Sequence, residues 1–419
     1  MKQNSCVAAI DIGTTKIAAI VGSVEPSGRI LVENQHCTFS QGVNRGIVVN
    51  IEDTTDSIRS CLNELYRKQG VRPDRVVVGI AGRHIESRQS SAQRIRPNPR
   101  KLISEEEVNS LRQQMYNIVL SPGQQILHVI PQEYIVDGRP LAKAAGCVGN
   151  VLVGNYHIVV CDASAVENIR MCIERCGLTM DSLVLEPIAS ANAVLTAEEK
   201  DAGVVLLDIG GGTSDMLIYY KNIVRSTTVI PRGGEVITGD IREVCRVSYQ
   251  MAERLKCEYG ACFEDCCSQD IIIPFYRDTA GREQSSITQK TLAEIIDYRM
   301  EEIIESVNYA IRESGYEKEV ASMVLTGGGA QLANLPQLFN LRTGLDVRVG
   351  YPRVQVGSKR YTLSPIMATS VGLMMNGYRD DRNAKSKIVG ILDGIPIVER
   401  IKRGLEGIFD EKNDRHFLS

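Results

Sequence analysis

AIDIGTTK at residues 9–16 and LLDIGGGTSDM at residues 206–216 are two versions of one short pattern, and they stand in the two halves of the 419-residue chain. In each version an apolar, β-prone run ends in aspartate, passes through glycine and threonine, and resumes as a second apolar run. That pattern predicts a strand, a tight glycine turn and a second strand. Its recurrence at corresponding places argues against coincidence and favours a shared role for the two hairpins.

The two turns suit phosphate binding. Glycine lacks the Cβ that would hold the backbone away from a ligand, so backbone N–H groups and threonine hydroxyls can converge on phosphate oxygens. Asp11 and Asp208, at the strand ends, are placed to hold a hydrated Mg²⁺. Two facing hairpins could grip one nucleotide, although each alone is also compatible with an ordinary hairpin turn. Neither is a Walker A loop, because G-x-x-x-x-G-K-[ST] is absent.

A third glycine turn, VLTGGGAQLANL at residues 324–335, follows an apolar strand and leads into a helical pattern. The bare backbone of Gly327, Gly328 and Gly329 makes it a candidate seat for a flat adenine ring.

Composition narrows the class of protein. The chain is long enough for two domains, its hydrophobic content of 43% is that of a globular protein, and a net charge of −3 gives no electrostatic footprint for nucleic acid. No signal peptide or apolar stretch of about 20 residues is found, so we expect a reducing cytosol for the twelve cysteines. Zinc binding by Cys257, Cys262, Cys266 and Cys267 is less favoured than loop or buried thiols, because the spacing is irregular.

Helices alternate with strands along the chain, which indicates an α/β architecture. After a strand at residues 76–80, the basic segment 83–101 suggests a crossover into an inserted unit. In that unit Ser104 and Glu107 predict a capping box for a helix to about residue 118, and strands near 126–136 and 151–160 follow. A helix is expected at residues 163–175.

The second half is expected to begin at about residue 201. Apolar residues from Ile241 to Leu255 form one helical stripe and place Glu253 and Lys256 together on another face. That pair is either a solvated ion pair or a carboxylate for ribose with an ammonium near the base. A long packing helix is expected at residues 288–312, with Arg299 on its outer face.

The tail contains a charged stretch at residues 378–387, which indicates a linker, and then the amphipathic segment IPIVERIKRGLEGIF at residues 395–409. Its pattern alone favours docking on the protein's own core over a membrane interface. The apolar face is formed by Ile397, Val398, Ile401, Leu405, Ile408 and Phe409.

Together these residues resemble the actin, heat-shock-70 and sugar-kinase superfamily and, within it, the FtsA family of bacterial division proteins. The more specific marks, which cover nearly the whole chain in order, are RGIVVNIEDTTDSI (45–58), VVVGIAGRHI (76–85), LEPIASANAVL (185–195), GGEVITGDI (233–241), AERLK (252–256) and SPIMATSVGLMM (364–375).

The resemblance implies a two-lobed actin-like, ribonuclease H-like ATPase fold with a subdomain inserted in the first lobe. The implied divisions are a first-lobe core at 1–84, an insert at 85–157, and the first lobe again at 158–200 and 358–377. The second-lobe core lies at 201–232 and 302–357 with a small subdomain at 233–301, and a linker at 378–394 leads to a membrane helix at 395–411. The membrane role implied by the family thus replaces docking on the protein's own core.

The family's function implies ATP and Mg²⁺ as cofactors with at most weak ATPase activity. Its members polymerise on the cytoplasmic side of the cell membrane at the division site, bind the C-terminal tail of FtsZ and recruit later division proteins. Arg299 and Arg282 are the candidates for meeting the FtsZ tail.

Carried over residue by residue, Asp11 and Asp208 match the acids that organise Mg²⁺. Glu186 matches a residue that orients water, unless it only caps the following helix. Phosphate contacts match Gly13, Thr14, Thr15, Lys16, Gly210, Gly211, Gly212 and Thr213. The nucleoside side matches Gly234, Glu253, Lys256, Gly327, Gly328 and Gly329.

Some features depart from the family. Residues 139–152 lack the Asp-Pro and Gly-Met pattern that often closes the insert, the linker is short, and the cysteine cluster has no counterpart. Alternatives are a small-molecule kinase, a chaperone-like ATPase, and a rod-shape or pilus-assembly filament protein. The first lacks an unassigned acid for a base, the second lacks a substrate domain, and the insert and tail argue against the third.

Overall fold

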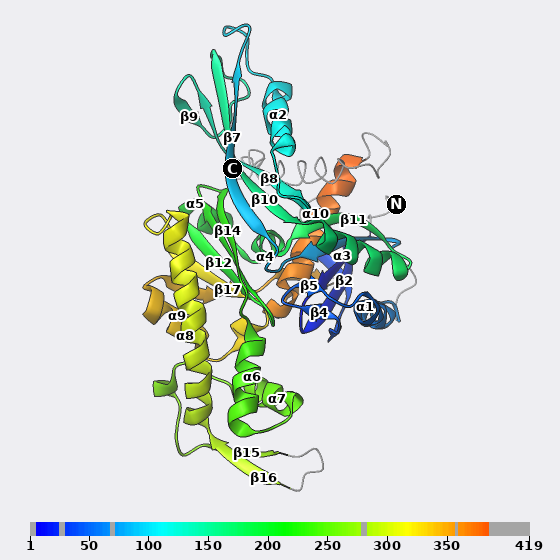
Figure 1. The fold of residues 1–419 in the computed structure, drawn as a ribbon, viewed down its shortest axis with the longest axis vertical. Helices are drawn as coiled ribbons and strands as arrows, with labels where there is room; N and C mark the ends of the chain where they lie inside the picture. The colour runs from blue at the N-terminus through cyan, green and yellow to red at the C-terminus, as the bar shows by residue number, and fades with distance from the viewer. Residues whose placement is uncertain (1–5, 25–29, 68–71, 278–282, 357–358, 385–419) are drawn as a thin grey trace.

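The computed structural model describes residues 6–24, 30–67, 72–277, 283–356 and 359–384. Two lobes lie side by side in the middle of an elongated molecule, with a smaller unit at each end (Figure 1). The first lobe is built on a seven-stranded sheet in the order β11-β6-β1-β2-β3-β19-β20. Its strands are β1 (Val7–Ile12), β2 (Lys16–Val24), β3 (Ile30–Phe39), β6 (Arg75–Ile80), β11 (Thr179–Leu185), β19 (Arg353–Val356) and β20 (Lys359–Thr362).

Helices cover both faces of this sheet because its central strands are apolar on both sides. Ile10 of β1 belongs to the core that includes Ile58 of α1 (Ile51–Tyr66) and Ile169 of α3 (Ala163–Arg175). Ala9, the next residue back, faces the core that includes Val371 of α10 (Ala368–Ala384). The period of two along β1 therefore places helices on both faces. Strand β11, at one edge of this sheet, leads directly into α4 (Glu186–Val194).

The second lobe repeats this plan in a five-stranded sheet in the order β14-β13-β12-β17-β18. In the first lobe β1 pairs antiparallel with β2 and parallel with β6, and in the second β12 pairs antiparallel with β13 and parallel with β17. The predicted hairpins are thus confirmed as equivalent central elements. The strands are β12 (Val204–Ile209), β13 (Ser214–Tyr220), β14 (Ile223–Ile230), β17 (Ser322–Thr326) and β18 (Asp346–Val349), with α5 (Ala197–Ala202), α8 (Gln289–Ser314) and α9 (Leu335–Thr343) as helices.

The inserted unit is a four-stranded sheet in the order β7-β10-β8-β9, with one helix against it. It consists of β7 (Glu86–Ile95), α2 (Glu105–Gln114), β8 (Gln124–Val136), β9 (Arg139–Leu141) and β10 (Val151–Asp162). The capping box of Ser104 and Glu107 is confirmed. The prediction of a crossover at residues 83–101 was wrong, because most of this polar segment is strand β7. The backbone of this segment forms a strand because it pairs with β10, and a search for alternating apolar residues does not predict such a polar strand.

The lower unit contains α6 (Gly234–Cys245), α7 (Tyr249–Tyr259), and the hairpin of β15 (Ile272–Tyr276) and β16 (Gln284–Thr288). The prediction of one apolar stripe from Ile241 to Leu255 was wrong. Arg246 adopts a left-handed conformation with φ of 54° and ends α6, while Ser248 caps α7, so two helices share the segment. Val244, assigned to the stripe, is 58% exposed.

Short elements complete the path: β4 (Val43–Asn44), β5 (Ile47–Val48), and the 3-10 turns η1 (Met115–Asn117), η2 (Glu264–Cys266), η3 (Gly329–Gln331) and η4 (Pro365–Met367). The predicted linker start at residue 378 was also wrong, because α10 continues to Ala384. Extending a packed helix through charged residues costs little, since its nucleus is already formed.

Several predicted residues lie outside the described ranges. They are Arg282, the rest of the linker, and the amphipathic segment with Ile397, Val398, Ile401, Leu405, Ile408 and Phe409. Within the described ranges, no helix combines the length and apolar character needed to cross a bilayer. Nor do three or more His, Cys, Asp or Glu side chains in those ranges gather as metal ligands would.

Candidate nucleotide-binding site

The two glycine hairpins face each other across the cleft between the lobes and line one cavity. Each turn is closed by the same hydrogen bond, from Gly13 N to Lys16 O in the first and from Gly210 N to Thr213 O in the second, both 2.9 Å. The turns also touch. A Cβ on Gly211 would overlap the Thr15 side chain, and one on Gly212 would overlap Thr14 Oγ1. Only glycine permits this approach.

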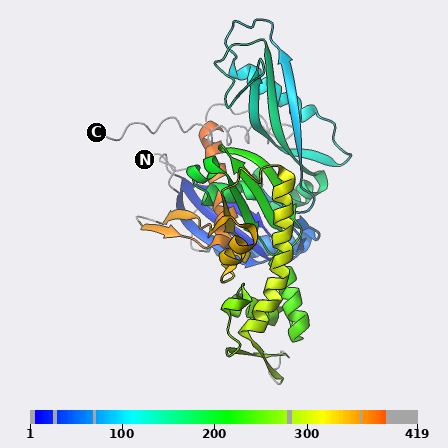
Figure 2. The same ribbon diagram turned by 90° about the vertical axis from the view of Figure 1, so that its left-hand side faces the viewer.

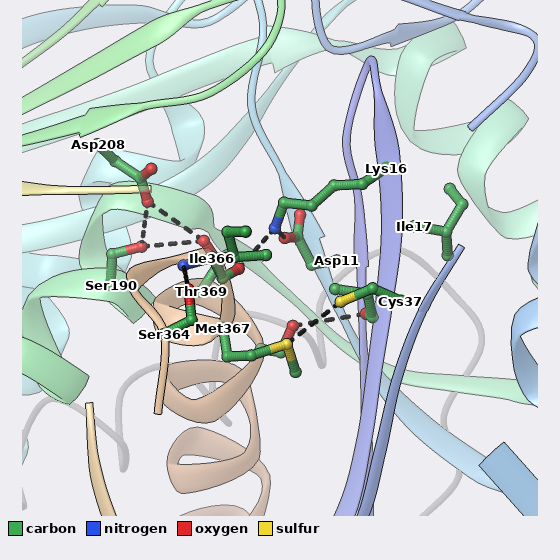
Figure 3. Close-up of polar contacts among 12 residues, drawn as sticks. Asp11, Lys16, Ile17, Cys37, Ser190, Asp208, Ser364, Ile366, Met367 and Thr369 are labelled. Atoms are coloured by element: carbon green, nitrogen blue, oxygen red, sulfur yellow. Dashed lines mark hydrogen bonds and ion pairs between the residues drawn. The ribbon is translucent and has the colours of Figure 1, made fainter. Parts of the chain in front are cut away.

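The two predicted magnesium-organising acids have different partners. Asp11 Oδ2 accepts a hydrogen bond from Lys16 Nζ at 3.0 Å, and the same ammonium donates to the carbonyl of Ile366 at 2.6 Å (Figure 3). Asp208 Oδ2 accepts from Ser190 Oγ at 2.6 Å and from Thr369 Oγ1 at 3.2 Å. Figure 3 shows the two carboxylates on opposite sides of η4, the turn that carries Ile366 and leads into α10.

Asp215 is a fourth acid of the cavity, beside Asp11, Asp208 and Glu186. It is 4% exposed, accepts from Thr213 Oγ1 at 2.9 Å through Oδ2, and its Oδ1 has no hydrogen-bond partner among the described residues. Four carboxyl groups thus share one ammonium, that of Lys16. The cavity has an excess of negative charge.

The pKa values reflect that excess. Burial, reinforced by Asp208, raises the pKa of Asp215 to about 7. Burial and the neighbouring acids Asp11, Asp215 and Asp208 raise the pKa of Glu186 well above its usual range. Burial also raises the pKa of Asp208, against the opposing hydrogen bond from Ser190. Burial favours neutral Lys16, but Asp11, Cys37 and Asp208 together outweigh it, and the pKa of Lys16 is raised. A bound cation would relieve this repulsion.

Glu186 is the first residue of α4, and its side chain does not cap that helix. It lines the cavity and packs against Gly79, where an added Cβ would lie 2.9 Å from Glu186 Cγ. The preceding residue, Leu185, donates its N–H to Nε2 of His128 at 2.9 Å. His128 lies on β8, so the insert directly supports the backbone that carries Glu186.

The residues predicted for the nucleoside side divide into two groups. Gly327 and Gly328 line the cavity, and an added Cβ on Gly327 would collide with Asp208 Oδ1. Gly329, Gly234, Glu253 and Lys256 do not line it. Lys256 Nζ instead donates to Gly234 O at 3.0 Å, Thr238 Oγ1 at 2.8 Å and Glu253 Oε2 at 2.7 Å. This cluster lies behind the second hairpin, because Gly234 N donates a hydrogen bond to Gly210 O of that hairpin.

The cavity has a volume of about 40 Å³. Because one water molecule occupies about 30 Å³ of the liquid, a triphosphate cannot be accommodated unless the lobes separate. The insert bridges the lobes at the other end of the cleft. Its Gln132 Nε2 donates to Val224 O at 3.0 Å, Ser87 Oγ donates to Thr227 O at 3.0 Å, and a ring nitrogen of His157 lies 2.9 Å from Thr227 Oγ1. Nucleotide uptake is therefore expected to strain these bonds.

Three polar side chains at this site were not predicted from the sequence. Asp215 could have been found, because it stands in the quoted LLDIGGGTSDM and pairs with Asp208 across the hairpin. Ser190 and Thr369 stand in the quoted strings at 185–195 and 364–375, but nothing in those strings indicates a contact with Asp208, which lies 18 and 161 residues away.

Arg299, predicted to meet a partner's carboxylates, is occupied within the chain. Its guanidinium donates to both carboxylate oxygens of Asp240, at 2.7 and 2.9 Å, and to Glu302 at 2.7 Å. The hydrogen bonds that Arg299 donates to Asp240 raise the pKa of Arg299. A partner's carboxylate would have to displace one of these acids.

Two family models match the chain. The model described as cell division protein FtsA matches residues 205–372, and that described as an SHS2 domain inserted in FtsA matches residues 82–160. The second range contains β7, α2, β8 and β9 and nearly all of β10.

Relatives extend the similarity to nearly the whole chain. The chain is 33% identical to cell division protein FtsA of Pseudomonas aeruginosa, over 98% of this chain and 99% of the relative. It is 33% identical to that of Neisseria meningitidis over 97% and 100%, and 29% identical to that of Escherichia coli K12 over 91% and 92%.

Solved structures show the same fold at low identity. A PilM–PilN type IV pilus biogenesis complex matches with a TM-score of 0.65 and 16% identity, over 89% of this chain and 98% of that one. MreB5 of Spiroplasma citri bound to ADP matches with a TM-score of 0.54 and 12% identity, over 91% and 99%. The prediction of an α/β, two-lobed actin-like fold with an insert in the first lobe is confirmed.

Proposed function

Because this chain belongs to the FtsA family of cell division proteins, we propose that it binds ATP with Mg²⁺ between its lobes and polymerises on the inner face of the cytoplasmic membrane. There it anchors FtsZ filaments through the FtsZ C-terminal tail and recruits later division proteins. The supporting observation is the pair of glycine hairpins that bring Asp11 and Asp208 to one cavity.

The cavity's chemistry fits a nucleotide with a divalent cation. Phosphate would lie against the turns at Gly13 and Gly210, with Lys16 neutralising part of its charge. Asp11 and Asp208 would hold the cation through its water shell, and Asp215 offers a free carboxylate oxygen beside them. The cation would supply the positive charge that four carboxyl groups with one ammonium lack.

Glu186 is the proposed residue for weak hydrolysis. A carboxyl group at the start of α4, aimed into the cavity, can orient a water toward the terminal phosphate. The raised pKa of Glu186 in this charge environment means that it ionises readily only when positive charge enters the cavity. Hydrolysis would then depend on the complete nucleotide and cation.

Isothermal titration calorimetry with ATP and MgCl₂ tests nucleotide binding. The double variant Asp11→Asn, Asp208→Asn keeps the side-chain shapes, removes both charges and is expected to lose binding. The matched control Asp56→Asn changes an exposed carboxylate of α1 and is expected to bind as the unmodified chain does. If neither the unmodified chain nor the control takes up ATP, or if the double variant binds equally well, the proposal is wrong.

Polymerisation and membrane attachment are tested on a lipid monolayer with ATP, examined by electron microscopy. We expect filaments on the lipid, because the proposed anchor at residues 395–411 would concentrate the chain there. A soluble kinase of the same fold would leave the monolayer bare, which would refute this part of the proposal.

A further inference from the structure

A groove of about 680 Å³ runs between β14 and α8 on the second lobe, away from the nucleotide cavity. Thr228 and Val229 line its strand side, and Glu305, Tyr309 and Glu313 line its helix side. In Figure 1, α8 is the long helix on the left and β14 lies beside it. The turned view of Figure 2 shows the same helix extending along the second lobe toward the lower unit.

The strand side of the groove carries one open pair of backbone groups, at Val229. β14 is the edge strand of its sheet. The carbonyls of Arg225 and Thr227 point outward, because Gln132 and Ser87 of the insert donate to them. Outward groups alternate along an antiparallel strand, so the N–H and C=O of Val229 point to the same edge. Val229 lies past the contacts with the insert, and no side chain of the described residues bonds to its N–H or C=O. A peptide main chain can pair with β14 there, between Thr227, whose carbonyl is occupied by Ser87, and Pro231, which has no N–H.

The helix side runs antiparallel to β14 over the same length. Arg225 stacks over the ring of Tyr316 at 5.6 Å, just past the end of α8, and Arg232 Nε lies 3.6 Å from Glu302. Seven residues of strand rise about 23 Å and fourteen residues of helix rise about 21 Å, so β14 and α8 cover nearly equal lengths along the groove. An extended peptide added to β14 would therefore follow α8 along the groove.

The helix side is negatively charged. Glu305 and Glu313 have no ion-pair or hydrogen-bond partner in the described structure, and the carbonyl end of the α8 dipole lies at the Glu313 end of the groove. Tyr309, 60% exposed, is midway between them in sequence. The two glutamates are eight residues apart, which is about 12 Å along a helix, and four residues of extended chain span about 13 Å. Residues i, i+2 and i+4 of a strand also share one face.

We propose that the groove between β14 and α8 binds an extended peptide of a partner protein, whose main chain pairs with Val229 of β14 and whose side chains face α8, cationic at positions i and i+4 on Glu313 and Glu305 and apolar at i+2 on Tyr309. Charge complementarity selects a cationic segment.

Fluorescence anisotropy of a labelled nine-residue peptide, Gly-Ser-Lys-Thr-Val-Thr-Arg-Ser-Gly, titrated with the full chain tests the proposal. We expect saturable binding that weakens about tenfold in Glu305→Gln, Glu313→Gln. The control Glu33→Gln, Glu243→Gln removes two exposed carboxylates elsewhere and should bind normally. A peptide with N-methyl groups on alternate backbone nitrogens of the edge-facing register should also bind more weakly, since the bond to the Val229 carbonyl needs one of those N–H groups.

Three results would overturn the proposal. Equal binding by the groove variant and the control would mean that charge attraction is not centred on the groove. Tighter peptide binding after removal of residues 385–419 would show that the tail is the natural occupant. A change in sedimentation of the groove variant without peptide would assign the groove to a second copy of the chain. ATP binding is measured on the same samples, so failure here is separable from failure of the nucleotide proposal.

Discussion

Replacing His157 with glutamine tests whether the insert's contact with the second lobe depends on pH. His157 is 1% exposed, and its Nε2 lies 2.9 Å from Thr227 Oγ1 of β14. Burial lowers the pKa of His157 from 6.5 to about 4. The imidazole therefore stays neutral in the native state at pH values where an unfolded chain would protonate it. Glutamine keeps a hydrogen-bonding amide at this position but does not titrate.

The sign and size of the effect follow from linkage. Because the folded pKa is depressed, the stabilisation is complete above pH 6.5 and is lost as the pH falls from 6.5 toward 4. At pH 5 the difference from 6.5 is 1.5 units, so His157 would have given up about 2 kcal/mol of local stability. Burial and His157 lower the pKa of His128 to about 3, and its contribution has the same sign. Asp215 and Glu186, with raised pKa values, contribute with the opposite sign.

Comparing variant with unmodified chain cancels the contributions that both share. Native-state hydrogen exchange of peptides from β10 and β14, measured at pH 7 and pH 5, reports the local free energy of opening. We expect the unmodified chain to lose about 2 kcal/mol more than His157→Gln between these pH values. Equal losses in the two proteins would show that the ring is solvated or protonated in the native state, and the argument from burial would fail.

Three further predictions concern other parts of the chain. Arg299→Glu should weaken capture of an FtsZ tail peptide at least fivefold, about 1 kcal/mol, while the exposed Arg312→Glu on the same helix should not; unchanged affinity in a fluorescence titration would move that site elsewhere. Removing the residues after Lys387 should abolish co-sedimentation with liposomes and leave ATP binding intact; equal sedimentation of both forms would refute the anchor. Arg96→Leu should destabilise the insert by about 3 kcal/mol in urea unfolding, because its buried guanidinium holds Glu107 and two carbonyls; a loss under 1 kcal/mol would mean that water replaces those bonds.

Local patterns with one dominant physical cause were readable from the sequence. The strand–glycine–strand pattern recurs because a turn that must approach a ligand, or another turn, closely tolerates no side chain. Ser104 and Glu107 were recognised as a capping box because both partners stand within one turn of helix. The helix at Ala163–Arg175 was found at its observed bounds, because Gly177, just beyond it, has the positive φ of 75° that glycine tolerates.

Features that depend on tertiary pairing were not readable. β7 is a strand only because β10 lies beside it, and its own residues are mostly polar. The break between α6 and α7 falls at Arg246, a residue type that does not favour positive φ. The helical pattern placed Arg299 on the outer face of its helix, but its ion-pair partner Asp240 lies 59 residues away and was not predicted. Acids that stand within short motifs, such as Asp11 and Asp208, were therefore predictable, whereas ion-pair partners distant in sequence were not.

The two turns differ in sequence in a way that the closed cleft explains. Thr14 and Thr15 of the first turn fill the space that Gly211 and Gly212 leave in the second. Gly46 N also donates to Thr14 Oγ1 at 3.0 Å, which holds that threonine in place. The pair of turns is therefore complementary rather than repeated, and phosphate oxygens would compete with threonine side chains for the glycine backbone. Since the same closure is held at the other end by the insert's bonds to β14, nucleotide uptake and the position of the insert should be coupled through one motion of the lobes.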